Sequence, residues 1–222
     1  MSKTPLLAGA LILTLALGVA PALAKKQKAA PKAPSSSSIT EIDVRVCIGA
    51  DGSSADQQIA ACTKIINSGK IHHPHEGDYY ATRGAAYLAV KDFDAALADY
   101  DKALSFEQKG EFYFQRSLVL MAKNQVERAK ADLAQVIKLN PQFAQAYFIR
   151  GLIYYGVADY KNAVADFDAA AQRQPLFYKA IFARGAAKTR LGDDSGGKED
   201  LKQARGLSAH IDDEMQKLGI VP

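Results

Sequence analysis

The chain has 222 residues, of which 48% are hydrophobic and 23% charged, so it can form one compact domain or one short repeat array. Its formal net charge is +4, but five lysines and no acidic residue precede residue 39. From Ile39 onward 23 basic residues face 24 acidic ones, a net charge of −1. This balance excludes a strongly basic domain, and we expect no nucleic-acid partner.

Residues 1–24 have the order of a secretory signal peptide. Lys3 supplies the positive start, residues 6–20 carry no charge, and Ala22 and Ala24 supply the small residues before a cleavage point. The apolar run of about 15 residues is shorter than the roughly 20 that a spanning helix needs. We therefore expect export to the periplasm, with an uncleaved signal anchored in the inner membrane as the alternative.

Residues 25–38, "KKQKAAPKAPSSSS", contain no large apolar side chain. Such a segment buries too little surface to offset the entropy of ordering, which predicts a basic, disordered linker. The linker can serve as a soluble tether or contact anionic envelope surfaces.

Residues 39–76 are expected to form a cap that precedes the main array. The stretch "SADQQIAACTKII" predicts an amphipathic helix that places Cys62 on its apolar face. Because disulfides persist in exported proteins, Cys47 and Cys62 are predicted to form a bridge that pins this cap.

Three of the four histidines, His72, His73 and His75, lie close together before the next helix. They are a weak metal candidate, because a structural zinc site needs four converging ligands. Pro74 suits a turn, and the acidic residue Glu76 suits a helix start, so the loop interpretation is preferred. No other cofactor is expected.

A repeat of 33 or 34 residues follows the cap. Small residues recur at Gly84, Ser117, Gly151 and Gly185, each directly after an arginine. These arginines are expected to be solvated or paired rather than catalytic. The period and the helical spacing of apolar residues predict pairs of antiparallel helices. Asp92, Asn124 and Asp159 are predicted N-caps of second helices, with Glu127 completing a capping box after Asn124.

The segments "DYYATRGAAYLAVKDFDAALADYDKAL" and "AYFIRGLIYYGVADYKNAVADFDAAAQRQP" carry a resemblance to the tetratricopeptide repeat family. The resemblance implies an all-α, right-handed solenoid of helical hairpins. Four repeats are expected, at residues 77–109, 110–143, 144–177 and 178–209, followed by a capping helix and tail at residues 210–222.

The same resemblance implies a groove lined by the first helix of each repeat. The residues expected there are Phe114, Leu118, Met121, Phe148, Leu152, Tyr155, Phe182, Lys179 and Arg190. Because no P-loop, GxGxxG or GxSxG motif is present, no catalytic activity is expected. The predicted function is a periplasmic scaffold that binds a protein or peptide through this apolar, aromatic groove, with Phe148 outside the interhelix core. The alternatives are that the chain's own terminal helix covers the groove, that a homodimer buries it, or that the histidine loop binds metal.

Overall fold

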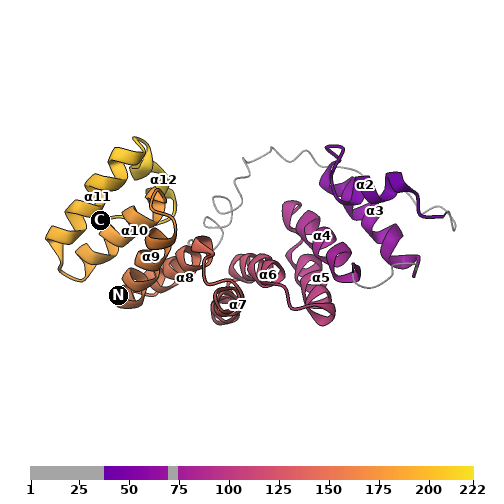
Figure 1. Ribbon diagram of the computed structural model, residues 1–222, viewed down its shortest axis with the longest axis horizontal. Coiled ribbons are helices and arrows are strands. Elements are labelled where there is room, and N and C mark those ends of the chain that lie inside the picture. Colours follow the sequence, from indigo (N-terminus) through magenta and orange to yellow (C-terminus); the bar gives the residue numbers. More distant parts are fainter. Residues whose placement is uncertain (1–37, 70–74) are drawn as a thin grey trace. The chain divides into compact units, whose positions relative to one another are not determined.

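The computed structural model describes residues 38–69 and 75–222 (Figure 1). These residues form eleven α-helices, in agreement with the predicted all-α fold class. The helices are α2 (Glu41–Cys47), α3 (Ala55–Asn67), α4 (Glu76–Ala89), α5 (Phe93–Phe106), α6 (Gly110–Ala122), α7 (Val126–Leu139), α8 (Ala144–Gly156), α9 (Tyr160–Arg173), α10 (Tyr178–Arg190), α11 (Asp194–Leu207) and α12 (Ile211–Lys217). Among these described helices, none is both long and apolar enough to cross a membrane.

The helices belong to two compact units that divide within α6, between Val119 and Leu120. In the first unit α2 packs on α3, α3 on α4, and α4 on α5. In the second unit each helix from α7 to α11 packs on the next, and α12 packs on α10 and α11. The predicted signal peptide, linker residues 25–37, His72 and His73 lie outside the described residues.

One type of turn joins the two helices within each repeat. The second residue after the first helix has a positive φ angle in all four repeats, at Lys91, Asn124, Ala158 and Gly192. In the third repeat the amide of Ala158 bonds to the carbonyl of Tyr155, and the amide of Asp159 to that of Tyr154. These are the two hydrogen bonds of a Schellman motif, which satisfies carbonyls at a helix end. Alanine at such a position carries a backbone strain of about 1–2 kcal/mol that glycine avoids.

This turn corrects the predicted role of Asn124. Its φ of 57° places it at the end of α6, whereas Gln125 precedes α7 and gives no side-chain cap. Asparagine suits the position because it tolerates left-handed backbone angles better than most residues. Glu127 forms an ion pair with Lys130 at 2.9 Å instead of a capping box. The N-caps predicted at Asp92 and Asp159 are confirmed.

Glycines allow close contact between the paired helices of a repeat. A Cβ atom at Gly151 would lie 2.6 Å from Cε1 of Phe167, and one at Gly185 would lie 2.9 Å from Cβ of Asp200. In the second repeat Ser117 takes the same position, fully buried, and its hydroxyl donates to the carbonyl of Phe114 at 2.6 Å. The small residues therefore recur because a larger side chain would separate the helices.

The N-terminal cap is held by the predicted bridge between Cys47 and Cys62, both fully buried, with Cα atoms 4.9 Å apart. An ion pair of 2.7 Å between Lys64 and Asp43 also joins α2 to α3. Hydrogen bonds from Lys64 and Thr40 lower the pKa of Asp43 to about 2. Within the cap, α2 is therefore fixed to α3 by one covalent and one ionic contact.

Replacement of Gly185 by alanine is expected to lower the free energy of unfolding by about 1–3 kcal/mol, because its Cβ would overlap the backbone carbonyl of Gly197. Gly206 of α11 is the matched control, since a Cβ added there would meet no side chain or neighbouring helix within 4 Å. Gly206→Ala should raise stability by up to about 1 kcal/mol through helix propensity. Urea denaturation measures both. If Gly185→Ala is as stable as the unmodified chain, the helices do not cross closely at this point.

Candidate functional site

Three of the four first helices, α4, α8 and α10, are each oriented by an arginine that binds an aspartate sixteen residues later. The pairs are Arg83–Asp99 in the first unit, and Arg150–Asp166 and Arg184–Asp200 in the second. In every pair Nε donates to one carboxylate oxygen at 2.8 Å and a terminal nitrogen donates to the other at 2.7 Å. The three aspartates are at most 6% exposed. Bidentate, charge-assisted bonds of this kind fix both distance and orientation.

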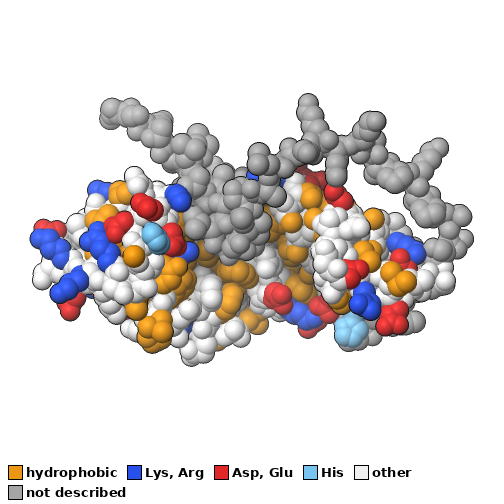
Figure 2. All heavy atoms as spheres, turned by 90° about the horizontal axis from the view of Figure 1, so that it is seen from above, with side chains coloured by type: hydrophobic (Ala, Val, Ile, Leu, Met, Phe, Trp, Pro, Cys, Tyr) orange, Lys and Arg blue, Asp and Glu red, His pale blue; other side chains and the backbone are white. Residues whose placement is uncertain are grey.

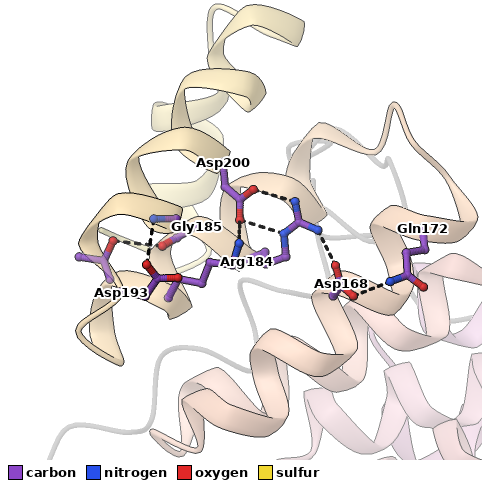
Figure 3. Close-up of polar contacts among 9 residues, drawn as sticks. Asp168, Gln172, Arg184, Gly185, Asp193 and Asp200 are labelled. Carbon is purple, nitrogen blue, oxygen red and sulfur yellow. Dashed lines mark hydrogen bonds and ion pairs between the residues drawn. The ribbon is translucent and has the colours of Figure 1, made fainter.

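A third guanidinium nitrogen of Arg83 and of Arg184 reaches back to the helix that precedes the repeat, and Arg116 makes the same kind of backward contact. Such contacts join Arg83 to Thr63 at 3.0 Å, Arg116 to Asp101 at 2.7 Å, and Arg184 to Asp168 at 2.6 Å. Figure 3 shows Arg184 of α10 between Asp200 of α11 and Asp168 of α9. One arginine thus connects three helices. The equivalent position before Arg150 is Ala134, whose side chain cannot accept a hydrogen bond.

The charge state of Asp200 depends on its cationic neighbours. Burial raises the pKa of this carboxyl, but hydrogen bonds from Arg184 and Lys188 outweigh that effect and lower the pKa overall. Asp200 is therefore ionised at neutral pH, and its ion pairs contribute stability that is lost as the pH falls toward the lowered pKa.

Sequence reasoning predicted that the arginines were structural, and the structure confirms that they are paired. The prediction did not identify the aspartates that pair with them. A periodic pattern could have indicated these partners, because aspartates recur at residues 99, 132, 166 and 200 with the same period as the arginines.

Most of the predicted groove residues are buried rather than open to a partner. Six of the nine are at most 8% exposed: Leu118, Met121, Phe148, Leu152, Tyr155 and Phe182. Phe114 and Lys179 are partly exposed, and Arg190 is exposed. As folded, the six buried side chains do not form an open apolar stripe.

The expectation that Phe148 lies outside the interhelix core is wrong, because its side chain is buried and contacts two other aromatic rings. Its ring centroid is 4.8 Å from that of Phe177 and 5.9 Å from that of Phe167 on α9. Phe148 lies three residues before Gly151, which is only about 60° around the helix from it. A phenylalanine ring is long enough to cross that angle and reach the second helix, so Phe148 contributes to folding.

Three of the predicted groove residues contact the chain's own C-terminal segment, residues 208–222. Tyr155 of α8 donates its hydroxyl to the carbonyl of Val221 at 2.8 Å, and Arg190 of α10 donates to the same oxygen at 3.4 Å. Lys179, also on α10, forms an ion pair with Glu214 of α12 at 3.0 Å. The first-helix face of the second unit therefore already binds a polypeptide segment.

The histidine cluster gains no support as a metal site from the residues that the structure describes. His75 is the one described member of the histidine cluster; it is largely exposed and its Nδ1 lies 3.4 Å from Asp78. No group of three metal-binding side chains occurs among the residues that the structure describes. The acidic, glycine-rich stretch at residues 192–200 forms a turn and the first half of α11, where Asp193 caps the helix.

Charges are mixed on the visible surface. In Figure 2 basic and acidic side chains of the described residues are interspersed, with apolar side chains between them. No single-sign patch of the kind that binds nucleic acid is visible on the described part of this face.

Comparison with known families identifies the repeats. Residues 77–109, 110–143 and 144–175 each match the tetratricopeptide repeat. The chain is a tetratricopeptide repeat protein, as its sequence resemblance indicated. Proteins with these repeats bind other proteins or peptides and are generally non-catalytic scaffolds.

Solved structures agree with this fold. A MamA protein is 19% identical, with a TM-score of 0.67, over 76% of this chain and 91% of that one. MamA from Desulfovibrio magneticus RS-1 (residues 41 to the end) is 18% identical, with a TM-score of 0.67, over 79% of this chain and 99% of that one. YrrB, described as a tetratricopeptide repeat protein with an unusual peptide-binding site, is 19% identical, with a TM-score of 0.61, over 74% and 82%. At these identities the likeness shows the fold alone. A search of curated protein sequences found no match.

Replacement of Asp200 by asparagine should lower the free energy of unfolding by about 3 kcal/mol or more, because it leaves the largely buried charge of Arg184 without its main partner. Asp168 is the control, since it contacts the same guanidinium but its side chain is 42% exposed. Asp168→Asn should lower the free energy of unfolding by less than about 1 kcal/mol. Denaturation at several pH values measures both, and the deficit of Asp200→Asn should shrink as the pH falls below about 4. Equal costs for the two variants would contradict the assigned role of Asp200.

Proposed function

We propose that this chain is a non-catalytic scaffold that binds a partner polypeptide on its inner face, the face formed by the first helices of the repeats. The observation that carries the proposal is the contact of Tyr155, Lys179 and Arg190 with residues 208–222. This face supplies a hydroxyl donor, two cations and buried aliphatic surface to a polypeptide segment. Such groups suit a partner that offers backbone carbonyls, a carboxylate and apolar side chains.

Rigid first helices favour this function. Bidentate Arg–Asp pairs hold α4, α8 and α10 against their second helices, so side chains on the opposite side are presented in fixed positions. A preorganised surface loses less entropy when a partner binds. In the first unit Ala85 of α4 lies one position after Gly84 and is exposed, which makes it a suitable probe of the inner face.

The test uses photo-crosslinking at Ala85, followed by binding measurements with the purified partner. A photoreactive residue at Ala85 should crosslink to one partner polypeptide, whereas one at Ala98 of α5 should not, although both alanines are exposed. Titration calorimetry should then show that Ala85→Arg weakens partner binding by at least about 1.4 kcal/mol, a factor of ten. Ala98→Arg should leave the affinity unchanged.

Two results would contradict the proposal. One is equal partner affinity for Ala85→Arg and Ala98→Arg when both variants melt like the unmodified chain. The other is crosslinking at Ala85 only to a second copy of this chain, which would instead support the alternative of a self-assembling homodimer.

We also propose that the chain is exported to the periplasm. Support comes from the charged, apolar and small-residue order of residues 1–24 and from the buried bridge between Cys47 and Cys62. Reducing conditions in the cytoplasm disfavour such a bridge, whereas the periplasm allows it to persist.

Mass spectrometry of non-reduced protein from a periplasmic extract tests the export proposal. The expected mature chain begins near Lys25 and offers no thiol to an alkylating reagent. Its bridge joins residues 15 positions apart in the sequence. Reduction should therefore lower the free energy of unfolding of the cap by about 3 kcal/mol, the value that a chain-entropy model gives for a loop of this length. Cytoplasmic protein with an intact leader and two free thiols would refute export.

A further inference from the structure

The C-terminal segment covers the inner face of the second unit with a compact apolar contact. Ile211 and Met215 of α12 are fully buried, and Leu218 and Ile220 are at most 4% exposed. These four residues follow the spacing i, i+4, i+7 and i+9, so the first three lie on one side of a helix. The segment packs on α10 and α11 of the second unit.

A glycine turn directs the end of this segment back toward α8. Gly219 has a φ of 74°, and the amides of Gly219 and Ile220 bond to the carbonyls of Gln216 and Met215. This Schellman motif ends α12 and reverses the chain. The carbonyl of Val221 thereby reaches Tyr155, 66 residues earlier, and Arg190.

The segment lacks the Arg–Asp pair that fixes α4, α8 and α10. Met215 stands 34 residues after Ile181, so α12 occupies the place of a fifth first helix. Leu218, however, stands where Arg184 stands one repeat earlier, and so no Arg–Asp pair of the repeated kind is possible here. The contact from Arg205 of α11 to Asp212 is about half exposed on both sides and is therefore weak.

Its helix is also short. With seven residues, α12 is well below the ~12–15 residues at which an isolated helix becomes even marginally stable in water. Its order therefore depends on the surface beneath it. When that surface is taken by another polypeptide, the segment has no other reason to remain folded.

We propose that residues 208–222 are a displaceable intramolecular ligand of the face formed by α8 and α10, and that the partner polypeptide competes with them for it. The partner is then an amphipathic segment with large aliphatic residues at i, i+4 and i+7. It carries an acidic residue for Lys179, as Glu214 does, and a backbone carbonyl for Tyr155 and Arg190. This inference rests on the proposed function and specifies the partner's chemistry. Because the segment and the partner compete, the apparent affinity for the partner is lowered in proportion to the fraction of molecules in which the segment has left the face.

The experiment uses the full chain and a fluorescent synthetic peptide of residues 208–222 as the probe. Met215→Asp places a charge at the buried position of α12 and should release the segment, whereas Gln216→Asp places the same charge on an exposed neighbour. Fluorescence anisotropy should show the peptide binding to Met215→Asp at least ten times more tightly than to Gln216→Asp or the unmodified chain. Equal affinities for all three would overturn the proposal.

A charge exchange tests the specificity of the site. Lys179→Glu, introduced together with Met215→Asp, should lose at least ten-fold in affinity for the peptide. A peptide carrying Glu214→Lys should regain most of that affinity. Failure of the exchanged peptide to recover binding would refute the assigned contact between Lys179 and Glu214 as a recognition element.

Hydrogen exchange on the unmodified chain tests displaceability without any variant. The amides of α12 should exchange at least ten-fold faster than those in the centres of α10 and α11, because the segment opens independently. Exchange of all three helices in step would make the segment a permanent part of the fold and overturn the proposal. These results are independent of the Ala85 test. Peptide binding can fail while the external partner still binds, and partner binding can fail while the segment still opens.

Discussion

The structure depends on the close crossing of two helices at a glycine that follows an arginine. The absence of a Cβ at Gly185 lets α10 approach α11 so closely that Arg184 can reach Asp200 with two hydrogen bonds. The two features need each other. A buried carboxylate is unfavourable unless it is paired, and the arginine can pair only at this separation. The same arrangement at Arg83 and Arg150 gives the array its repeated geometry.

The fold was predictable from sequence because this crossing leaves a periodic trace. Small residues at a fixed phase and apolar residues at helical spacing are visible without coordinates, and they predicted an all-α array of paired helices, which the structure shows. The aspartates were overlooked because charged residues are rarely buried, so an aspartate on an amphipathic helix suggests the solvent side. Asn124 was misassigned for a related reason. Asparagine suits both an N-cap and a left-handed helix end, and only the backbone angle distinguishes the two.

The candidate site was only partly predictable. The repeat phase selected Tyr155, Lys179 and Arg190 as residues of a binding face, but it could not show that residues of the chain's own C-terminal segment contact them. The contact between Tyr155 and Val221 joins residues 66 positions apart and depends on the reversal at Gly219. No local pattern encodes such a contact. Phe148 shows the same limit at shorter range, because the reach of its ring decides whether it belongs to the groove or to the core.

The end of the Arg–Asp pattern separates the fixed part of the second unit from the exchangeable part. Bidentate ion pairs demand one partner in one orientation, so α10 and α11 cannot be exchanged for other helices without leaving a buried charge unpaired. Burial of aliphatic side chains is non-directional. The contacts of Met215 and Leu218 can therefore be reproduced by any segment with the same spacing of apolar residues. In the proposed arrangement, leucine in place of arginine at this phase of the repeat, together with the shortness of α12, leaves the helix replaceable and the first-helix face beneath it available to another segment.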